Sequence, residues 1–131
     1  MMTAPVTVGK HVTLSEAHRI MQEKDIRHLP VLEGGVILGV ISDRDIRTFS
    51  GLKTVDMRKE TVEEACTLVP YVVSPHEKLD QVCAEMAENK YGSVLVQDGN
   101  KIVGIFTWVD ALRAMDELLN ELLRKGPRVE I

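Results

Sequence analysis

The sequence predicts an α+β fold built from two tandem copies of one unit. The first observation is an internal duplication: GVISDRD, Gly39–Asp45, returns as GIFTWVD, Gly104–Asp110, 65 residues later. At the same offset of 65, residues 5–50 align onto residues 70–115 without a gap. The second observation is hydrophobic patterning that alternates along short stretches and changes to helical spacing between them. Two units that each leave one sheet face bare would bury those faces against each other.

The first unit is expected to open with a short strand in Met1–Val8, where apolar residues alternate and Pro5 favours extended backbone. Thr13 and Glu16 have the spacing of a capping box, and the apolar residues that follow recur at helical spacing. This pattern predicts a helix over Leu14–Lys24. The next two strands form a hairpin and are expected at Arg27–Leu32 and Val36–Ile41, with the turn at Gly34-Gly35.

Between the units the pattern loosens, and the charged stretch from Gly51 to Val69 is expected to be a linker. A second capping-box pattern, Thr61 with Glu64, predicts a short helix near Val62–Leu68. The domain boundary is therefore placed between residues 1–58 and 59–131. The remaining elements are expected at Tyr71–Val73, Leu79–Met86, Ser93–Gln97, Lys101–Phe106 and from Trp108 or Val109 to Arg124.

Composition excludes several classes of function. A formal net charge of −4, from 16 basic and 20 acidic residues, argues against general binding to nucleic acids or acidic membranes. No apolar run reaches the length of a membrane span, so the expected location is the cytoplasm. Cys66 and Cys83 lack metal-site spacing and are expected to be reduced and buried. The histidines lack the i, i+4 spacing of a helical zinc pair, so no metal site is expected.

The repeated strand-to-helix junction is the main candidate site. Each copy places a hydroxyl residue, Ser42 or Thr107, three positions before an aspartate, Asp45 or Asp110. One interpretation is structural, because a hydroxyl and an acid in the first turn cap a helix. The other is functional, because a hydroxyl, a carboxylate and free N–H groups at a helix start can hold a sugar diol and a phosphate. The residues alone leave both interpretations open.

In this order and repeated, the motifs resemble a tandem pair of cystathionine-beta-synthase (CBS) domains, a Bateman module. The resemblance is carried by Met2–Val8, Arg27–Leu32, the turn glycines Gly34 and Gly99, and the two glycine-to-aspartate stretches. It implies two β-α-β-β-α CBS units that pack pseudo-symmetrically, sheet to sheet, with ligand clefts between them. It also implies a regulatory module for adenosine-containing ligands such as AMP, ADP or ATP, with no cofactor required.

The resemblance further implies which residues bind the ligand. It places adenine against the backbone of Val6 and Thr7 and phosphates on Arg27, His28 and Arg44, although this basic trio could also be a solvated surface. The full set of expected ligand-binding residues is Val6, Thr7, Arg27, His28, Pro30, Ser42, Arg44, Asp45, Tyr71, Ser93, Thr107 and Asp110.

The two expected clefts differ in charge, because the second unit has Gly92, Ser93 and Val109 where the first has its basic trio. The first cleft is therefore expected to favour phosphorylated ligands, more strongly as the pH falls towards 6. Trp108 is expected to report on the second cleft.

No catalytic motif is present: the sequence has no nucleophile elbow, phosphate-binding loop or metal triad, so no enzymatic activity is expected. The last helix has a leucine-rich stripe longer than the unit needs. The stripe predicts packing on the body or on a second subunit, and a homodimer is preferred. The leading hypothesis is an adenine-nucleotide sensor that signals to an unidentified regulated protein. The alternative is a ligand-independent dimerisation scaffold.

Overall fold

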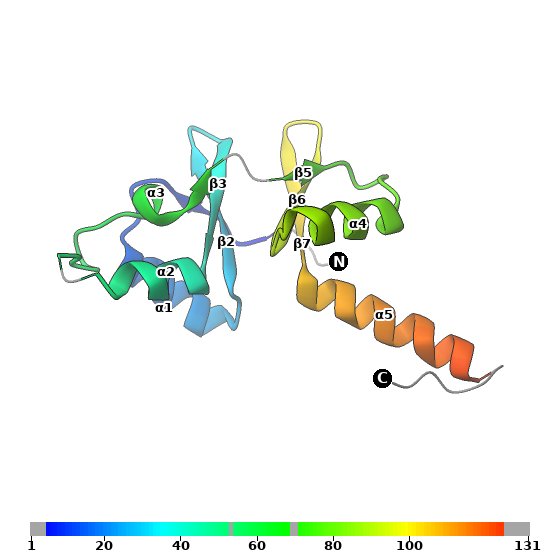
Figure 1. The fold of residues 1–131 in the computed structure, drawn as a ribbon. Coiled ribbons are helices and arrows are strands. Elements are labelled where there is room, and N and C mark those ends of the chain that lie inside the picture. The colour runs from blue at the N-terminus through cyan, green and yellow to red at the C-terminus, as the bar shows by residue number, and fades with distance from the viewer. Residues whose placement is uncertain (1–4, 53, 69–70, 125–131) are drawn as a thin grey trace.

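The computed structural model describes residues 5–52, 54–68 and 71–124, which form two sheets with helices on their outer sides (Figure 1). One sheet has the strand order β1-β2-β3-β4, and the other has the order β5-β6-β7. The predicted α+β fold of two β-α-β-β-α units is confirmed, with α3 and β4 between the units. The elements are β1 (Val8–Gly9), α1 (Leu14–Lys24), β2 (His28–Glu33), β3 (Val36–Ser42), α2 (Asp43–Ser50), α3 (Val62–Ala65), β4 (Thr67–Leu68), β5 (Val72–Val73), α4 (Leu79–Asn89), β6 (Ser93–Asp98), β7 (Lys101–Thr107) and α5 (Trp108–Leu123).

The two hairpins, β2-β3 and β6-β7, repeat the same backbone register. The register shifts between Val31 and Leu32 in the first hairpin and between Val96 and Gln97 in the second, two places 65 residues apart. Each hairpin turns through glycine with positive φ, a conformation that side chains with a Cβ rarely adopt. These turn glycines are Gly34, Gly35 and Gly99.

Helix α1 has the predicted bounds. The Oγ1 of Thr13 accepts a hydrogen bond from the N–H of Glu16 at 3.2 Å, so the predicted cap is present. The helix ends at Asp25, which adopts the left-handed conformation with φ of 53°. Its buried face is the one predicted by the apolar spacing and includes Leu14, Ala17 and Met21.

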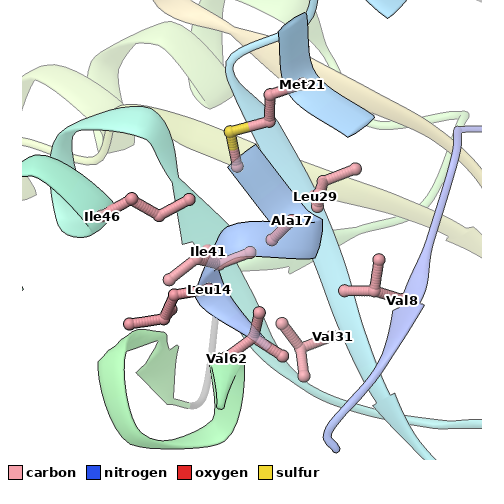
Figure 2. Packing of buried hydrophobic residues seen from close by; sticks show 9 residues of the cluster. All are labelled: Val8, Leu14, Ala17, Met21, Leu29, Val31, Ile41, Ile46 and Val62. Carbon is pink, nitrogen blue, oxygen red and sulfur yellow. The ribbon is translucent and has the colours of Figure 1, made fainter. Parts of the chain in front are cut away.

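Each repeat has a hydrophobic core between its sheet and its helices. The core of the first repeat joins residues of β1, α1, β2, β3, α2 and α3, and Figure 2 shows its nine members: Val8, Leu14, Ala17, Met21, Leu29, Val31, Ile41, Ile46 and Val62. Within the described residues, the core of the second repeat is smaller, and no helix there plays the part that α3 plays in the first. Its buried residues are Val82, Met86, Val94, Val96 and Phe106.

The two repeats pack sheet to sheet, with their helices on the outer sides (Figure 1). Pro30, Val40 and Leu95 are buried but belong to neither core. Pro30 pairs with Val40 across the first hairpin, and both alternate with residues that face the helices. These three side chains therefore lie on the inner sheet faces, where each repeat covers the other.

The linker region differs from the prediction. Helix α3 ends at Ala65, and Thr67–Leu68 forms a strand that adds to β3. The side chain of Thr61 makes no capping hydrogen bond, so the second predicted cap is wrong. The added strand explains the glycine of the first motif, because a Cβ on Gly39 would lie 2.2 Å from the backbone oxygen of Thr67.

The two ends of the described chain also differ in detail from the prediction. The first strand contains Val8–Gly9 alone, and residues 1–4 of its predicted range lie outside the described residues. Helix α5 ends at Leu123 and has no buried residue. Its apolar stripe does not pack on the body, since Leu112, Met115 and Leu122 are 57%, 52% and 63% exposed.

Both cysteines, Cys66 and Cys83, are free and half-buried, so the prediction that they are buried was wrong.

Candidate functional site

A cavity with a volume of about 920 Å³ lies between the two repeats. The first repeat contributes the start of β2, the end of β3 and the first turns of α2. The second repeat contributes the turn between α4 and β6, the residue before β5 and the first residue of α5. This central cavity is lined by Arg27, His28, Val40, Ser42, Asp43, Arg44, Asp45, Arg47, Thr67, Tyr71, Lys90, Tyr91, Gly92, Ser93 and Trp108.

The junction between β3 and α2 presents a carboxylate to the central cavity. The N–H of Asp45 donates to the Oγ of Ser42 at 3.0 Å, and the N–H of Ser42 donates to Oδ2 of Asp45 at 2.9 Å. The structural interpretation of the motif is therefore correct, because both halves of a capping box are present. Oδ1 of Asp45 accepts no hydrogen bond from the described residues, so the capped carboxylate keeps one oxygen for a ligand.

The duplicate junction has the same geometry in a different place. The N–H of Thr107 donates to Oδ2 of Asp110 at 2.8 Å, and the N–H of Asp110 donates to Oγ1 of Thr107 at 3.4 Å. Asp110 lines a second, smaller cavity beside α4 and α5, whereas Thr107 lines neither cavity. The two copies of the motif thus have one local structure and two surroundings.

Positive charge gathers around the central cavity, and part of it is already neutralised. Oδ2 of Asp43 lies 3.2 Å from Nε of Arg47 and 3.5 Å from Nη1 of Arg27, so this carboxylate pairs with both arginines. Among the described residues, Arg44 and Lys90 have no acidic partner within ion-pair distance. These two side chains, one from each repeat, are the cations that remain available to an anionic ligand.

His28 lies where the two repeats meet. A Cβ placed on Gly92 of the second repeat would lie 3.9 Å from Nε2 of His28. Burial lowers the pKa of His28 below its ordinary value of 6.5, and the nearby carboxylates of Asp45, Asp110 and Asp43 oppose this shift without cancelling it. Burial therefore disfavours the protonated form of His28. The rise in phosphate affinity with falling pH stays a prediction, and this shift would move it to lower pH.

Aromatic side chains form the wall contributed by the second repeat. The rings of Tyr71 and Tyr91 have centroids 5.3 Å apart and planes inclined by 34°. Trp108 is 55% exposed and lines the same cavity. A planar base has a face to stack against on this side. The tryptophan and Arg44 line one cavity, so the structure does not place Trp108 at a separate second cleft, and its response to ligand stays a prediction.

The central cavity brings together seven of the twelve predicted ligand-binding residues, namely Arg27, His28, Ser42, Arg44, Asp45, Tyr71 and Ser93. Val6, Thr7, Pro30 and Thr107 do not line it, and Pro30 is instead buried between the sheets. The charge difference was expected between two separate clefts. In the structure, Gly92 and Ser93 of the second repeat line the same cavity as Arg27 and His28 of the first, so the difference lies between two sides of one cavity.

Sequence reasoning missed Lys90, Tyr91 and Arg47. Lys90 follows α4 and has a φ of 58°, the left-handed conformation that also ends α1 at Asp25. The repeat could have predicted this helix end, because Lys90 lies 65 residues after Asp25. In both places the left-handed residue ends a helix and directs the chain back towards the sheet. Arg47 lies one turn after Asp43 on α2, a spacing that places both side chains on one face.

Metal and membrane sites are not found in the described residues. No three histidine, cysteine, aspartate or glutamate side chains in the ranges 5–52, 54–68 and 71–124 are placed to hold a metal ion. Within the same ranges, no helix has the length and apolar character needed to cross a bilayer.

Comparisons with known proteins agree on one family. The model of the CBS domain matches residues 1–51 and 58–117. A CBS domain-containing protein of Bacillus subtilis, YhcV, is 28% identical over 124 residues, which are 92% of this chain and 84% of that protein. L-aspartate semialdehyde sulfurtransferase of Methanocaldococcus jannaschii is 32% identical over 111 residues, 83% of this chain but 21% of that enzyme. The chain therefore spans a small part of the sulfurtransferase.

A solved structure of similar fold contains ligands. The CBS domain pair of protein MJ0100, in complex with 5′-methylthioadenosine and S-adenosyl-L-methionine, superposes with a TM-score of 0.81 and 27% identity. The match covers 90% of this chain and 93% of that one. Both ligands of that protein contain adenosine.

Proposed function

The chain belongs to the CBS domain family, and from that premise we propose that it is a regulatory module that binds an adenosine-containing nucleotide in the central cavity. One observation carries the proposal: the cavity joins a helix-capping carboxylate, two cations without an acidic partner among the described residues, and an aromatic wall, with contributions from both repeats. These groups match the three parts of a nucleotide. The adenosine compounds bound by the similar MJ0100 pair support the ligand class.

Asp45 is proposed to hold the ribose. Its Oδ2 is committed to the helix cap, and Oδ1 can accept a hydroxyl hydrogen of the sugar. A hydrogen bond to a charged group contributes about 1.5–3 kcal/mol when it is excluded from water. Because the capping box fixes the carboxylate on the first turn of α2, little side-chain freedom is lost when the ligand binds.

Arg44 and Lys90 are proposed to hold the phosphates. The planar guanidinium of arginine can donate two parallel bonds to a phosphate, and the lysine ammonium adds a second charge from the opposite repeat. Arg27 and Arg47 are held by Asp43 and shape the wall. A phosphate placed between Arg44 and Lys90 would favour approach of the two repeats, which provides a way to report ligand binding.

The base is proposed to stack on the aromatic wall of Tyr71, Tyr91 and Trp108. Val6 and Thr7, the backbone contacts implied for adenine by the family, lie outside the cavity. The module is proposed to be non-enzymatic.

Helix α5 favours a second role, dimerisation. Its apolar side chains Leu112, Met115, Leu118 and Leu122 are each more than half exposed. The helix itself extends beyond the repeat (Figure 1). A stripe of this kind is covered in a stable assembly. We propose that a second copy covers it, so that the molecule is a homodimer. A ligand-independent scaffold would use the same helix, and it remains the alternative function.

The test combines native mass spectrometry with calorimetry. Native mass spectrometry of the purified chain would show both its stoichiometry and any nucleotide bound to it. Calorimetric titration with AMP should then give an affinity that falls about tenfold or more in the Asp45→Ala variant. The matched control is Thr13→Ala, which also removes a helix cap but lies outside the cavity, and it should keep the affinity of the unchanged chain. Equal AMP affinity in all three proteins would show that Asp45 only caps α2.

A further inference from the structure

The two repeats differ on the outer face of the sheet, opposite the central cavity. In the first repeat α3 covers this face, and Val62 is fully buried beside Leu14, Val31 and Ile41 (Figure 2). Backbone hydrogen bonds fix the helix there: the N–H of Val62 donates to the oxygen of Val12 at 2.8 Å, and the N–H of Leu14 donates to the oxygen of Glu60 at 2.9 Å. The outer face of the first sheet is thus covered by a one-turn helix whose single buried aliphatic side chain, Val62, packs into the core.

In the second repeat the same face carries a groove of about 360 Å³, which we call the α4–α5 groove. Leu79 occupies the repeat position of Leu14, yet it is 46% exposed while Leu14 is 0% exposed. The groove is lined by Val73, Ser74, Pro75, Glu77, Leu79, Val82, Val96, Phe106, Asp110, Ala114 and Glu117. Both sheet faces are lined by apolar residues, but α3 packs over this surface in the first repeat, whereas the described residues leave a groove there in the second.

Within the part of the chain that the structure describes, the start of α4 also lacks a backbone partner that the start of α1 has. Helix α1 receives the side-chain cap of Thr13 and the backbone oxygen of Glu60 from the α3 segment. Helix α4 begins after Lys78 with no side-chain cap. A segment lying in the groove as α3 lies on the first repeat would offer its backbone oxygens to the first N–H groups of α4.

The rim of the α4–α5 groove is acidic, whereas the corresponding rim of the first repeat carries a lysine that faces an acidic residue of α3. On the first repeat, Lys10 lies 3.7 Å from Glu63 of α3. The position equivalent to Lys10 is Pro75, so this cation is lost, and Glu77 and Glu117 stand where the first repeat has Val12 and Leu52. A segment with the acidic residues of α3 would be repelled, and a basic one would be attracted.

From these observations we propose that the α4–α5 groove binds a short amphipathic helix of a partner protein. The helix inserts one aliphatic side chain against Leu79, Val96 and Phe106, as Val62 does in the first repeat, and it carries lysine or arginine beside Glu77 and Glu117. The α3 helix of a second copy does not meet this requirement, because its sequence VEEA presents two acids. The groove is separate from the central cavity, and the proposal does not depend on nucleotide binding.

The experiment attaches a model of the partner helix to the full chain. Residues 57–68, with Glu63→Lys and Glu64→Lys, are fused ahead of Met1 through a glycine-serine linker, which supplies an effective concentration on the order of 1 mM. Cys66→Ser in the fused segment prevents oxidation. The control fusion keeps both glutamates and differs in nothing else. Hydrogen exchange of the amides of Leu79 and Asp80 and NMR signals of Phe106 report on the groove.

We expect the lysine fusion to slow exchange at Leu79 and Asp80 at least fivefold and to shift the Phe106 signals, and the glutamate fusion to match the unfused chain. In the double variant Glu77→Lys and Glu117→Lys, the preference should reverse. Both substituted residues are exposed, and circular dichroism checks that the fold is kept. Equal protection by the two fusions, or no protection by the lysine fusion, would overturn the proposal. Loss of AMP binding to the central cavity would leave these results unchanged.

Discussion

Leu14 and Leu79 provide a test of the packing difference within one chain. They occupy equivalent positions in α1 and α4, and truncating each to alanine removes the same atoms. Leu14 is 0% exposed beneath α3, whereas Leu79 is 46% exposed. Leu14→Ala should lower the free energy of unfolding by about 2–5 kcal/mol, because the substitution loses the transfer term and leaves a closed cavity.

Leu79→Ala should cost much less. About half of its side chain is already in water, and the space left behind opens into the groove, so only part of the transfer term is lost and no closed cavity forms. We expect a cost of roughly 1 kcal/mol. Urea unfolding followed by far-ultraviolet circular dichroism measures both values. Leu52→Ala, at a position 54% exposed, is the control and should lie within about 0.5 kcal/mol of the unchanged chain. Equal costs for Leu14 and Leu79 would refute the argument that α3 distinguishes the two repeats.

Three further predictions concern pH, fluorescence and assembly. Because burial lowers the pKa of His28 below 6.5, the unfolded chain binds more protons just below that pH, and stability should fall as the pH drops through this window. His28→Gln should flatten this fall in urea unfolding at several pH values. Trp108 emission should change when AMP is added, and Arg44→Ala should weaken that response as salt does. Leu118→Glu with Leu122→Glu should give a folded monomer in sedimentation experiments, and a persistent dimer would contradict the role of α5.

Local signals explain why much of the fold could be predicted from the sequence. Helix α1 was placed correctly because its cap, its apolar spacing and its exit all lie within Thr13–Asp25. The hairpins were placed within a residue because glycine turns separate short runs of mostly apolar residues. The capping boxes at Ser42 and Thr107 needed only a spacing of three residues.

Contacts distant in sequence explain the errors. The strand Thr67–Leu68 forms because β3 offers an edge, a property of the folded sheet that the charged linker sequence does not contain. Lys90, Tyr91 and Trp108 reach the cavity only because the second repeat packs across the first. Val6 and Thr7 were assigned from family resemblance, and no pattern in the residues themselves had placed them beside the cavity.

The central cavity and the α4–α5 groove meet on a single helix. Trp108, the first residue of α5, lines the cavity, while Asp110, Ala114 and Glu117 of the same helix line the groove. A helix moves largely as a unit, so a nucleotide that shifts Trp108 would also shift one wall of the groove. The coupling would be reciprocal: a nucleotide that strengthens helix binding by some factor must itself be bound more tightly, by the same factor, when the helix is present. Comparing AMP affinity in the lysine fusion and the glutamate fusion measures that factor directly.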